Sequence, residues 1–338
     1  MTALLEARNV SKIFTGGGFR NRKQVIALEN ASLTIDGERP SITAIAGESG
    51  SGKTTLARLM LGIATPTTGH VIYNGKPVDT MNGDSWRVFR REVQAIFQDP
   101  FDVYNPFYKV EHTLLLSAQK FHLAKTRGER YALIEDALRT VGLRPEETIG
   151  RFPHQLSGGQ RQRIMVARAC LLRPKLIVAD EPVSMVDASL RATILEDLLK
   201  LNQELGISLI YITHDLTTAY QIANSIVMLY QGATVEMGDV ELVIKKPEHP
   251  YTQLLVSSIP LPDPKLRGQR SRLQGTLDET TGLIGQGCRF SARCPHAMDR
   301  CRQAAPPLYR TSERRAVACY LYDSAPEISS EEVAKVFA

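Results

Sequence analysis

Nearly continuous apolar runs and helix-like segments alternate along the first 230 residues of the chain. The apolar runs span residues 41–46, 175–179, 208–213 and 225–230. Such runs predict buried parallel strands, because a parallel sheet is covered on both faces. Shorter strand candidates lie at residues 33–35, 71–73 and 93–97, and helix-like segments lie at residues 53–61, 161–172 and 190–205. The alternation predicts an α/β layer architecture, in which the last helix is a crossover between two parallel strands.

This pattern is interrupted once and then ends. Residues 111–143 hold two helix-like stretches without strand signals, which predicts a helical insert over about 101–165. After residue 245 prolines become frequent and break regular structure. We therefore expect one domain over residues 1–245 and a small, loop-rich, cysteine-containing domain over residues 246–338. Residues 16–24 and 265–287 are expected to form basic loops.

Composition narrows the class of protein. With 43% hydrophobic and 23% charged residues, the 338-residue chain is not expected to be disordered or collagen-like. No apolar run approaches the roughly 18 residues of a membrane span, and Glu6 stands where a secretion signal needs an apolar core. We therefore expect a cytosolic, reduced chain. The net charge of +5 is local, because residues 265–315 hold 11 basic and 4 acidic residues.

The segment Gly47-Glu-Ser-Gly-Ser-Gly-Lys-Thr-Thr55 matches the G-x-x-x-x-G-K-[ST] pattern of phosphate loops. A predicted strand precedes it and a predicted helix follows, and the helix N-terminus favours an anion. Lys53 should reach the outer phosphates and Thr54 should hold Mg²⁺. The alternative is a glycine-rich turn with a surface lysine. The residues expected to bind the nucleotide here are Gly47, Glu48, Ser49, Gly50, Ser51, Gly52, Lys53, Thr54 and Thr55.

Two carboxylates follow the apolar run that ends at residue 179. An aspartate at the end of a buried strand is the usual partner of a phosphate-site Mg²⁺, which assigns this role to Asp180. Glu181 beside it could accept a proton from the water that attacks the terminal phosphate. The structural alternative is helix capping. The phosphate loop in the same chain favours the functional interpretation.

A second anion-binding segment is Leu156-Ser-Gly-Gly-Gln160, in which small residues precede a helix N-terminus. The alternative is a flexible helix start. Because this segment lies more than 100 residues from Lys53, one solution is that it binds the nucleotide of a partner chain. His214 follows a predicted strand, at the end of the sheet where such folds place ligands. Gln98 also follows a predicted strand, but a single glutamine in a turn does not by itself indicate a binding site. Positive charge is added by three arginines, Arg161, Arg163 and Arg168.

Together these residues resemble the ATP-binding-cassette (ABC) ATPases over residues 1 to about 245. The resemblance implies a P-loop NTPase (RecA-like) core with a helical ABC subdomain, and two cassettes that enclose two ATP molecules. It makes Phe14 the aromatic residue that stacks on adenine, Asp180 and Gln98 the Mg²⁺ ligands beside Thr54, and Glu181, His214 and Gln98 the catalytic residues. It assigns the contacts with the other cassette's ATP to Ser157, Gly158, Gly159, Gln160 and Asp187. Met185-Val186 departs from the commoner Ala-Leu before Asp187.

The tail narrows the resemblance to the oligopeptide/dipeptide importer ATPases. The stretches that carry it are residues 248–255, 259–263 and 287–296. This resemblance implies an ATPase bound peripherally at the cytoplasmic face of the inner membrane, without nucleic acid. Its partners would be a second ATPase subunit (a copy or a paralogue), two transmembrane permease subunits and an extracytoplasmic solute-binding protein. Some relatives carry oligosaccharides, nickel or other solutes, so the transported solute stays open.

Four cysteines of the tail, Cys288, Cys294, Cys301 and Cys319, follow the spacing C-x5-C-x6-C-x17-C. Four thiols in a reduced chain suggest a metal site more than disulfides. The spacing differs from a zinc ribbon, and sulfur ligands suit either zinc or an iron–sulfur cluster. Family resemblance favours a [4Fe–4S] cluster, and free thiols are the alternative. The fifth, Cys170, is expected in the core.

Two other functional classes were weighed. A cassette ATPase of DNA repair or translation would show a long coiled-coil insert or two cassettes in one chain, and neither pattern occurs here. A small-molecule P-loop kinase is disfavoured by the intact Leu156–Gln160 segment and by His214. An importer ATPase is therefore the leading hypothesis.

Overall fold

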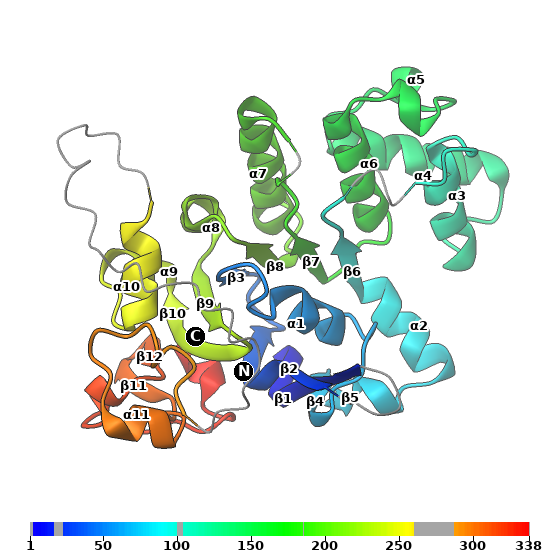
Figure 1. Ribbon diagram of the computed structural model, residues 1–338. Helices are drawn as coiled ribbons and strands as arrows, with labels where there is room; N and C mark the ends of the chain where they lie inside the picture. Colours follow the sequence, from blue (N-terminus) through cyan, green and yellow to red (C-terminus); the bar gives the residue numbers. More distant parts are fainter. Residues whose placement is uncertain (1–2, 17–22, 100–103, 185, 260–286, 338) are drawn as a thin grey trace. The chain divides into compact units, whose positions relative to one another are not determined.

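The chain folds into two units, and neither is continuous in sequence. The computed structural model describes residues 3–16, 23–99, 104–184, 186–259 and 287–337 (Figure 1). The first unit comprises Met1–Glu38, Thr43–Asp79 and Thr213–Ala338, and the second comprises Arg39–Ile42 and Thr80–Ile212. Most residues of the expected loops at 16–24 and 265–287 lie outside the described residues. The described ends of the first loop differ from the prediction, because Gly16 closes one strand and Lys23 opens the next.

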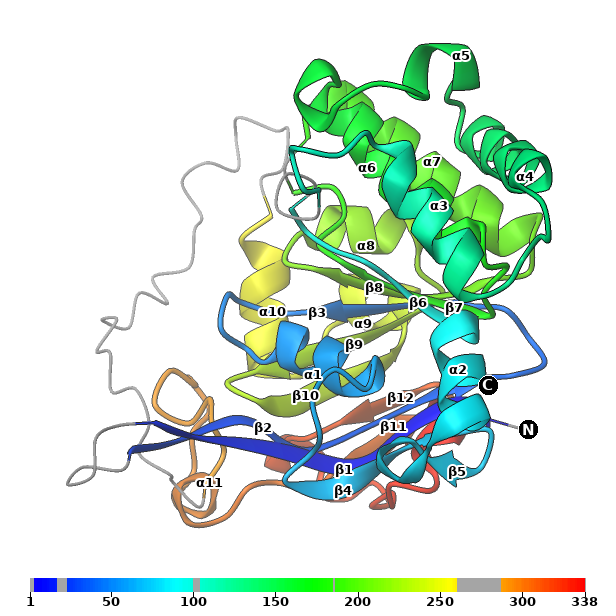
Figure 2. The ribbon, with the colours of Figure 1, turned by 90° about the vertical axis from the view of Figure 1, so that its right-hand side faces the viewer.

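An antiparallel sheet forms one layer of the first unit. Its strand order is β2-β1-β4-β5, with β1 at Ala3–Gly16, β2 at Lys23–Asp36, β4 at Thr68–Tyr73 and β5 at Lys76–Pro77. Buried and accessible positions are mixed along β1, as expected for a sheet with one covered face. Helix α1 (Lys53–Met60) packs on β1 and β2, and Figure 2 shows it between this sheet and β3.

The other strands of the first unit follow the order β11-β12-β10-β9-β3. Their bounds are Ile42–Ala46 for β3, Ser225–Tyr230 for β9, Ala233–Asp239 for β10, Tyr309–Ser312 for β11 and Arg315–Val317 for β12. Strands β3 and β9 are parallel and the remaining pairs are antiparallel. All residues of β3 and β9 are buried, which confirms these two apolar runs as core strands.

Short helices complete the first unit. They are α8 (Leu216–Ile222), α9 (Val240–Lys245), α10 (Pro250–Ser257) and α11 (Asp299–Gln303), with 3-10 turns η1 (Val78–Thr80), η4 (Tyr320–Tyr322) and η5 (Val333–Val336). Turn η5 contacts both β2 and β10, so the last residues of the chain pack against strands from its beginning and middle.

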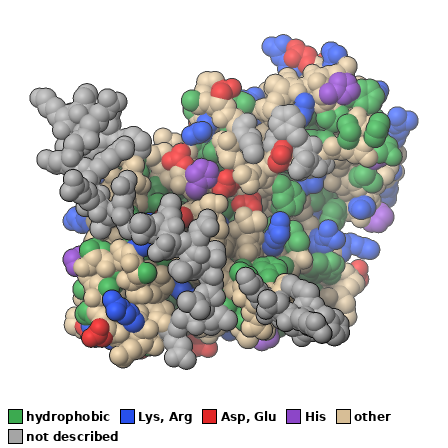
Figure 3. All heavy atoms as spheres, in the orientation of Figure 1, with side chains coloured by type: hydrophobic (Ala, Val, Ile, Leu, Met, Phe, Trp, Pro, Cys, Tyr) green, Lys and Arg blue, Asp and Glu red, His purple; other side chains and the backbone are tan. Residues whose placement is uncertain are grey.

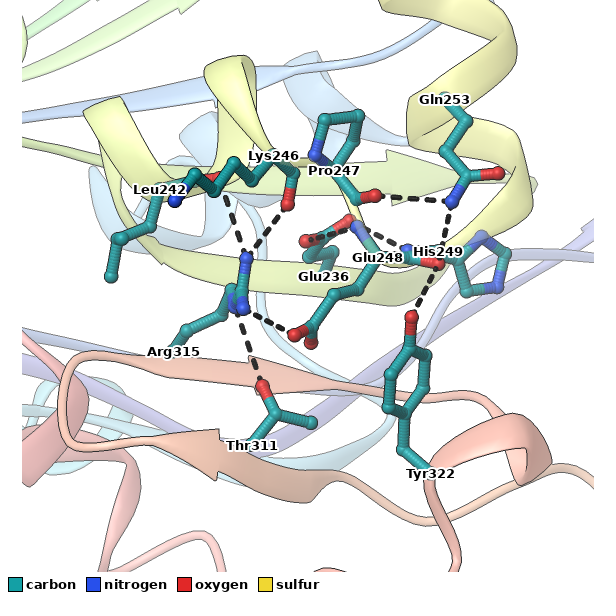
Figure 4. A network of polar contacts seen from close by, with 10 residues as sticks. All are labelled: Glu236, Leu242, Lys246, Pro247, Glu248, His249, Gln253, Thr311, Arg315 and Tyr322. Carbon is teal, nitrogen blue, oxygen red and sulfur yellow. Dashed lines mark hydrogen bonds and ion pairs between the residues drawn. The ribbon is translucent and has the colours of Figure 1, made fainter.

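A polar network ties the tail to strand β10 (Figure 4). Arg315 of β12 donates to the carbonyl oxygens of Leu242 and Lys246 and pairs with Glu248. Because β12 also pairs with β10, the residues on either side of position 245 share one sheet. The domain boundary expected at residue 245 stays a prediction.

The second unit combines three parallel strands with the helical insert. Strands β6 (Val93–Ile96), β7 (Leu176–Asp180) and β8 (Ser208–Thr213) pair in that order. The crossover helix is α7 (Ala188–Gln203), and α2 (Gly83–Glu92) precedes β6. The insert consists of α3 (Glu111–Lys120), α4 (Arg127–Thr140), α5 (Pro145–Thr148), the turn η2 (Pro153–Gln155) and α6 (Gly158–Cys170). Helices α3, α4 and α6 pack on one another, which confirms the predicted helical stretches.

Some elements differ from the sequence prediction. Helix α6 begins three residues earlier than expected because Ser157 caps it, accepting a hydrogen bond from the Gln160 backbone N–H. Strands β10, β11 and β12 and helix α2 were not predicted, because they are short or polar. Within the part of the chain that the structure describes, no helix combines the length and hydropathy needed to cross a bilayer.

Candidate functional site

The loop between β3 and α1 has a backbone that only glycine can adopt without strain at two positions. Gly47 has φ +151° and Gly52 has φ +101°. A Cβ atom at Gly47 would lie 2.1 Å from the Leu229 carbonyl oxygen, and one at Gly52 would lie 2.5 Å from the Ala27 carbonyl oxygen. The loop therefore runs directly along two other strands, and its glycines serve close backbone approach as well as positive φ.

The lysine of this loop points back into it. Lys53 is only 5% exposed, and its Nζ donates to the carbonyl oxygens of Gly47 and Glu48, both at 2.8 Å. Ser49, Gly50 and Thr54 are exposed at the start of α1. A buried ammonium group beside exposed small residues at a helix N-terminus is typical of an anion-binding site. The alternative of a glycine-rich turn with a surface lysine is wrong, because Lys53 is buried.

Two further predicted residues belong to the first unit. His214 directly follows β8 and is exposed, next to Asp215, which caps α8. Phe14 lies in β1 with 48% of its surface exposed, and the Lys12 ammonium group is 5.3 Å from its ring centroid. An exposed ring on a strand is available for stacking, which is what the family resemblance expects of Phe14.

The second unit brings Gln98 and Glu181 into direct contact. Gln98 Nε2 donates to Glu181 Oε2 at 3.1 Å, although the residues are 83 positions apart. Asp180 ends β7 and Glu181 follows with φ +45°, a left-handed conformation that is uncommon for a glutamate. The capping alternative is wrong for these carboxylates, because α7 begins only at Ala188 and is capped by Asp187. A strained acid held by an amide side chain is typical of a functional site.

The segment Leu156–Gln160 forms a fixed helix start. The Gln160 backbone N–H donates to Ser157 Oγ at 3.2 Å, and the Ser157 N–H donates to Gln160 Oε1 at 3.0 Å. This reciprocal pair is a capping box. Gly159 is buried, and a Cβ there would lie 2.0 Å from Leu190 Cδ2, so α7 approaches α6 closely. The alternative of a flexible helix start is therefore wrong.

The arginines after this segment have structural partners. Arg168 is largely buried and donates to the Ala95 carbonyl oxygen of β6, and burial lowers its pKa. Arg163 lies 3.7 Å from Asp197 of α7. The backbone of Arg161 accepts a hydrogen bond from Tyr104 at 2.9 Å. Arg163 and Arg168 both lie against other elements of the unit, and their expected contribution of positive charge to an anion site stays a prediction.

Asp187 is the N-cap residue of α7. Its carboxylate caps α7 by accepting from the Leu190 backbone N–H at 2.9 Å, and Ser189 Oγ donates to the same oxygen at 2.7 Å. These hydrogen bonds lower the pKa of Asp187. The residue is thus an ionised, fixed acceptor next to the close approach of α6 and α7.

We expect that Ser157→Ala lowers the free energy of unfolding by about 1 kcal/mol, because the helix loses its N-cap. Ser157→Asp should keep the cap, since aspartate is a good N-cap residue. It should nevertheless abolish the ATPase activity that the family resemblance implies, because it places a negative charge where the sequence predicts a bound phosphate. Urea unfolding and ATPase assays measure the two effects.

The matched control is Thr126→Ala at the N-cap of α4, which has the same capping box with Glu129. Thr126→Ala should lower the free energy of unfolding by a similar amount as Ser157→Ala and leave the activity unchanged. Full activity in Ser157→Asp would contradict an anion site at this helix start.

The four tail cysteines line one pocket together with His249, Phe290 and other residues of the first unit. Burial raises the pKa of the Cys288 and Cys294 thiols and raises that of Cys319 to about 11. All four are free thiols, and no set of three His, Cys, Asp or Glu side chains in the described residues is arranged to hold a metal ion. Burial raises the pKa of Cys170 to about 12, in keeping with its expected place in the core.

Two contacts to the phosphate loop were missed by sequence reasoning. Tyr251 Oη accepts a hydrogen bond from the Glu48 backbone N–H at 2.8 Å, and Arg293 pairs with the Glu48 carboxylate. Both residues lie about 200 or more positions beyond the loop. No spacing rule connects residues so far apart, so only their presence in the family-like tail could have drawn attention to them.

Two family models match the chain. Residues 28–184 match the model described as ABC transporter, and residues 235–301 match the model described as oligopeptide/dipeptide transporter, C-terminal region. The phosphate loop, Gln98, Leu156–Gln160 and Glu181 all fall within the first match.

Proteins similar over nearly the whole chain, and a solved structure similar over part of it, agree with these matches. The probable peptide ABC transporter ATP-binding protein y4tS of Sinorhizobium fredii is 39% identical over 94% of this chain and 90% of its own length. The di/tripeptide transport ATP-binding protein DppF of Pseudomonas aeruginosa is 38% identical over 95% of this chain and 98% of its own length. A dimeric post-hydrolysis structure of the ATP-binding cassette MJ0796 with ADP and Pi superposes with a TM-score of 0.62 at 28% identity. That superposition covers 70% of this chain and 98% of the other.

Proposed function

Since the chain belongs to the ABC transporter family as an ATPase with a P-loop NTPase fold, we propose that it powers the import of di- or oligopeptides. The observation that carries the catalytic part is the pair of preformed elements: the glycine loop closed over Lys53, and Glu181 held by Gln98. Two observations favour peptides as the transported solute. One is the match of the C-terminal region, and the other is that relatives aligned over nearly the whole chain are named as peptide transport proteins.

In this proposal the loop residues bind the ATP phosphates. Lys53 exchanges its bonds to the Gly47 and Glu48 carbonyl oxygens for phosphate oxygens, while the exposed N-terminus of α1 faces the anion. Phe14 stacks on the adenine ring. The hydroxyl of Thr54, the amide oxygen of Gln98 and the Asp180 carboxylate are hard oxygen donors, which suit Mg²⁺. When bound, Mg²⁺ neutralises charge that develops on the phosphates.

Hydrolysis requires that a water lose a proton as it attacks the terminal phosphate. Glu181 accepts this proton, and Gln98 orients its carboxylate through the 3.1 Å hydrogen bond. His214 contacts the terminal phosphate from the end of β8. As the family resemblance implies, the ATP of a second cassette is contacted by Ser157, Gly158, Gly159, Gln160 and Asp187. The start of α6 suits this role because a helix N-terminus favours an anion.

The partners follow from the family. We propose a second ATPase subunit, two transmembrane permeases and an extracytoplasmic solute-binding protein, with this chain bound at the cytoplasmic face of the inner membrane. The helical insert offers a contact surface for a permease: Phe107, Tyr108 and Leu116 are 85%, 51% and 39% exposed. Figure 3 shows hydrophobic side chains gathered on the surface over this insert. An exposed apolar patch of this kind marks a protein interface.

Purification from native membranes tests this assignment. The full chain should co-purify with two hydrophobic permease chains and a second cassette, and the binding protein loaded with di- or oligopeptides should stimulate ATPase activity of the reconstituted complex. Stimulation by oligosaccharide or nickel instead would replace the proposed solute. A stable complex with ribosomes or DNA would favour the non-transport class of cassette ATPase.

The cysteine pocket is proposed as the place of a [4Fe–4S] cluster. What supports the proposal is the donor set, because all four thiols of the tail line one pocket. The free side chains are not arranged as a metal site, so their sulfur atoms would have to move together on binding. Iron and acid-labile sulfide in anaerobically purified protein test the proposal, and colourless, metal-free protein would refute it.

A further inference from the structure

Glu48, the second residue of the phosphate loop, is held through three different groups. Its carbonyl oxygen accepts from Lys53 Nζ at 2.8 Å, and its backbone N–H donates to Tyr251 Oη at 2.8 Å. Its carboxylate accepts three hydrogen bonds from the Arg293 guanidinium group, at 3.1 to 3.3 Å. Two of these three contacts come from the tail rather than from the loop.

Arg293 itself is fixed on an aromatic cluster. Its guanidinium carbon lies 5.7 Å from the Tyr230 ring centroid and 5.6 Å from that of Phe290, distances at which cation–π attraction operates. Arg293 Nη1 also donates to Tyr230 Oη at 3.3 Å. The forked guanidinium group is thus oriented before it meets the Glu48 carboxylate, which makes the pair more specific than a lone surface ion pair.

The cluster below this arginine is rigid. The ring centroids of Tyr230 and Tyr251 are 4.6 Å apart, and Phe290 lies 5.3 Å from the first and 5.7 Å from the second. Tyr251 is 0% exposed, Phe290 1% and Tyr230 3%. Closely packed buried rings have little freedom to move, so the tail presents the Tyr251 hydroxyl and the Arg293 guanidinium at fixed positions.

A second arginine of the same tail segment reaches the loop's neighbours. Arg289 pairs with Glu29 of β2 at 2.5 Å. The Glu29 backbone N–H donates to the Gly232 carbonyl oxygen, and the Gly232 N–H donates to the Ser51 carbonyl oxygen of the loop. Arg289 and Arg293 therefore both link the short segment between Cys288 and Cys294 to the phosphate loop, one directly and one through backbone hydrogen bonds.

The charge of Glu48 makes these contacts relevant to ATP. An uncompensated carboxylate in a loop that binds a polyphosphate would repel its ligand. Arg293 neutralises this carboxylate, and Tyr251 fixes the backbone from which it projects. Since Arg293 is 29% exposed and Glu48 is 39% exposed, the pair contributes little to folding. Its effect is instead local to the loop that it contacts.

We propose that Arg293 and Tyr251 are positioning residues of the ATP site, through which the tail sets the affinity of the phosphate loop for nucleotide. The inference rests on the proposed role of this loop. It gives the tail a direct part in the ATPase reaction, beyond any contact that the tail makes with other subunits. It also means that a rearrangement of the Cys288–Cys294 segment would change the contacts of the loop.

Equilibrium binding of Mg-ATP to the full chain tests the proposal. Arg293→Ala should raise the dissociation constant about fivefold, the loss expected for one charge-assisted contact in a half-exposed site. Tyr251→Phe should raise it by a similar factor, because the Glu48 N–H loses its acceptor. In the reconstituted complex KM for ATP should rise while kcat stays unchanged, since neither residue touches the reacting phosphate.

Arg300→Ala is the matched control. Arg300 also pairs with a carboxylate, Asp323 at 2.5 Å, and lies 4.8 Å from the Tyr320 ring centroid, but it does not contact the loop. It should bind ATP as the wild type does. Arg293→Lys, which keeps the charge without the fork, should bind with intermediate affinity and serves as the test if the alanine variant does not fold.

The double variant Arg293→Ala/Glu48→Gln tests whether the effect of Arg293 on ATP binding acts through Glu48. Its dissociation constant should be no higher than that of Arg293→Ala, because the two residues act as one pair. Effects that multiply, or an Arg293→Ala variant that matches Arg300→Ala, would overturn the inference. Lys53→Ala should abolish binding. If it binds ATP normally, the proposed role of the loop itself fails, whatever the tail variants do.

Discussion

Glu181→Gln should bind ATP with unchanged affinity and lose turnover by about 10²- to 10⁴-fold, the contribution of a positioned general base. The amide has nearly the same shape as the carboxylate but cannot take up a proton from water. Gln98 now donates to Glu181 Oε2, and it can keep this hydrogen bond with the amide oxygen of the variant. The geometry of the site should therefore survive while the chemistry stops. Nucleotide binding and steady-state phosphate release, measured on the same preparation, separate the two effects.

Glu196→Gln provides the control for charge. Glu196 lies on the exposed side of α7, in the same unit, and its substitution removes the same formal charge. Both binding and turnover should match the wild type. Wild-type hydrolysis by Glu181→Gln would remove the assigned role of Glu181 and leave the left-handed backbone at that residue without a functional explanation.

The contacts that the sequence could foretell are those made by neighbours in the chain. The glycine pattern of Gly47–Thr55 predicts a strand, a loop and a helix start, and the structure has all three. The small residues before Gln160 likewise predict a helix N-terminus, although only the structure shows that Ser157 and Gln160 cap it reciprocally. Local motifs can be predicted from sequence because the properties that define them, positive φ at glycine and unpaired N–H groups at a helix start, involve only a few neighbouring residues.

Contacts across long sequence separations were not readable. Arg168 carries the charge expected of an anion-binding residue, but its side chain donates a hydrogen bond to the carbonyl oxygen of Ala95, 73 positions away. Tyr251 and Arg293 look like ordinary tail residues until they are found at Glu48. A side chain's partner in such cases is decided by how strands and helices pack, and the identity of the residue alone does not specify it.

The buried pair Glu236 and His249 should give single variants opposite pH dependences of stability. Burial raises the pKa of Glu236 to about 7, although hydrogen bonds from the backbone N–H groups of His249 and Glu248 lower it in part. Burial lowers the pKa of His249 to about 4. The two residues are in contact, since the His249 N–H donates to Glu236 Oε2 at 3.0 Å, and Figure 4 shows them together.

Between about pH 4.5 and 6.5, folding moves one proton within this pair, because His249 loses a proton and Glu236 gains one. The unfolded chain holds an ionised Glu236 and a protonated His249, because the ordinary pKa values are 4.5 and 6.5. The folded chain holds a protonated Glu236 and a neutral His249. The number of bound protons is equal in both states, so the pair gives the wild type almost no slope of stability with pH in this range.

Glu236→Gln should uncover the histidine. The pKa of His249 is lower in the folded than in the unfolded chain, so its contribution to the free energy of unfolding is fully present above pH 6.5. This contribution is lost as the pH falls towards 4, by at most about 3 kcal/mol for this shift. His249→Asn keeps an N-cap for α10 and should uncover the glutamate. That contribution is present below pH 4.5 and is lost as the pH rises to about 7, by a similar amount.

Urea unfolding at a series of pH values, read as the difference between each variant and the wild type, measures both slopes. Titrating groups far from this network cancel in the difference, because distant, independent sites contribute additively. The slopes should have opposite signs and similar size. Equal slopes in both variants would mean that the pair does not exchange a proton on folding. Flat differences would mean that Glu236 is ionised in the folded protein, held by its two backbone N–H donors, and that His249 titrates as it does in water.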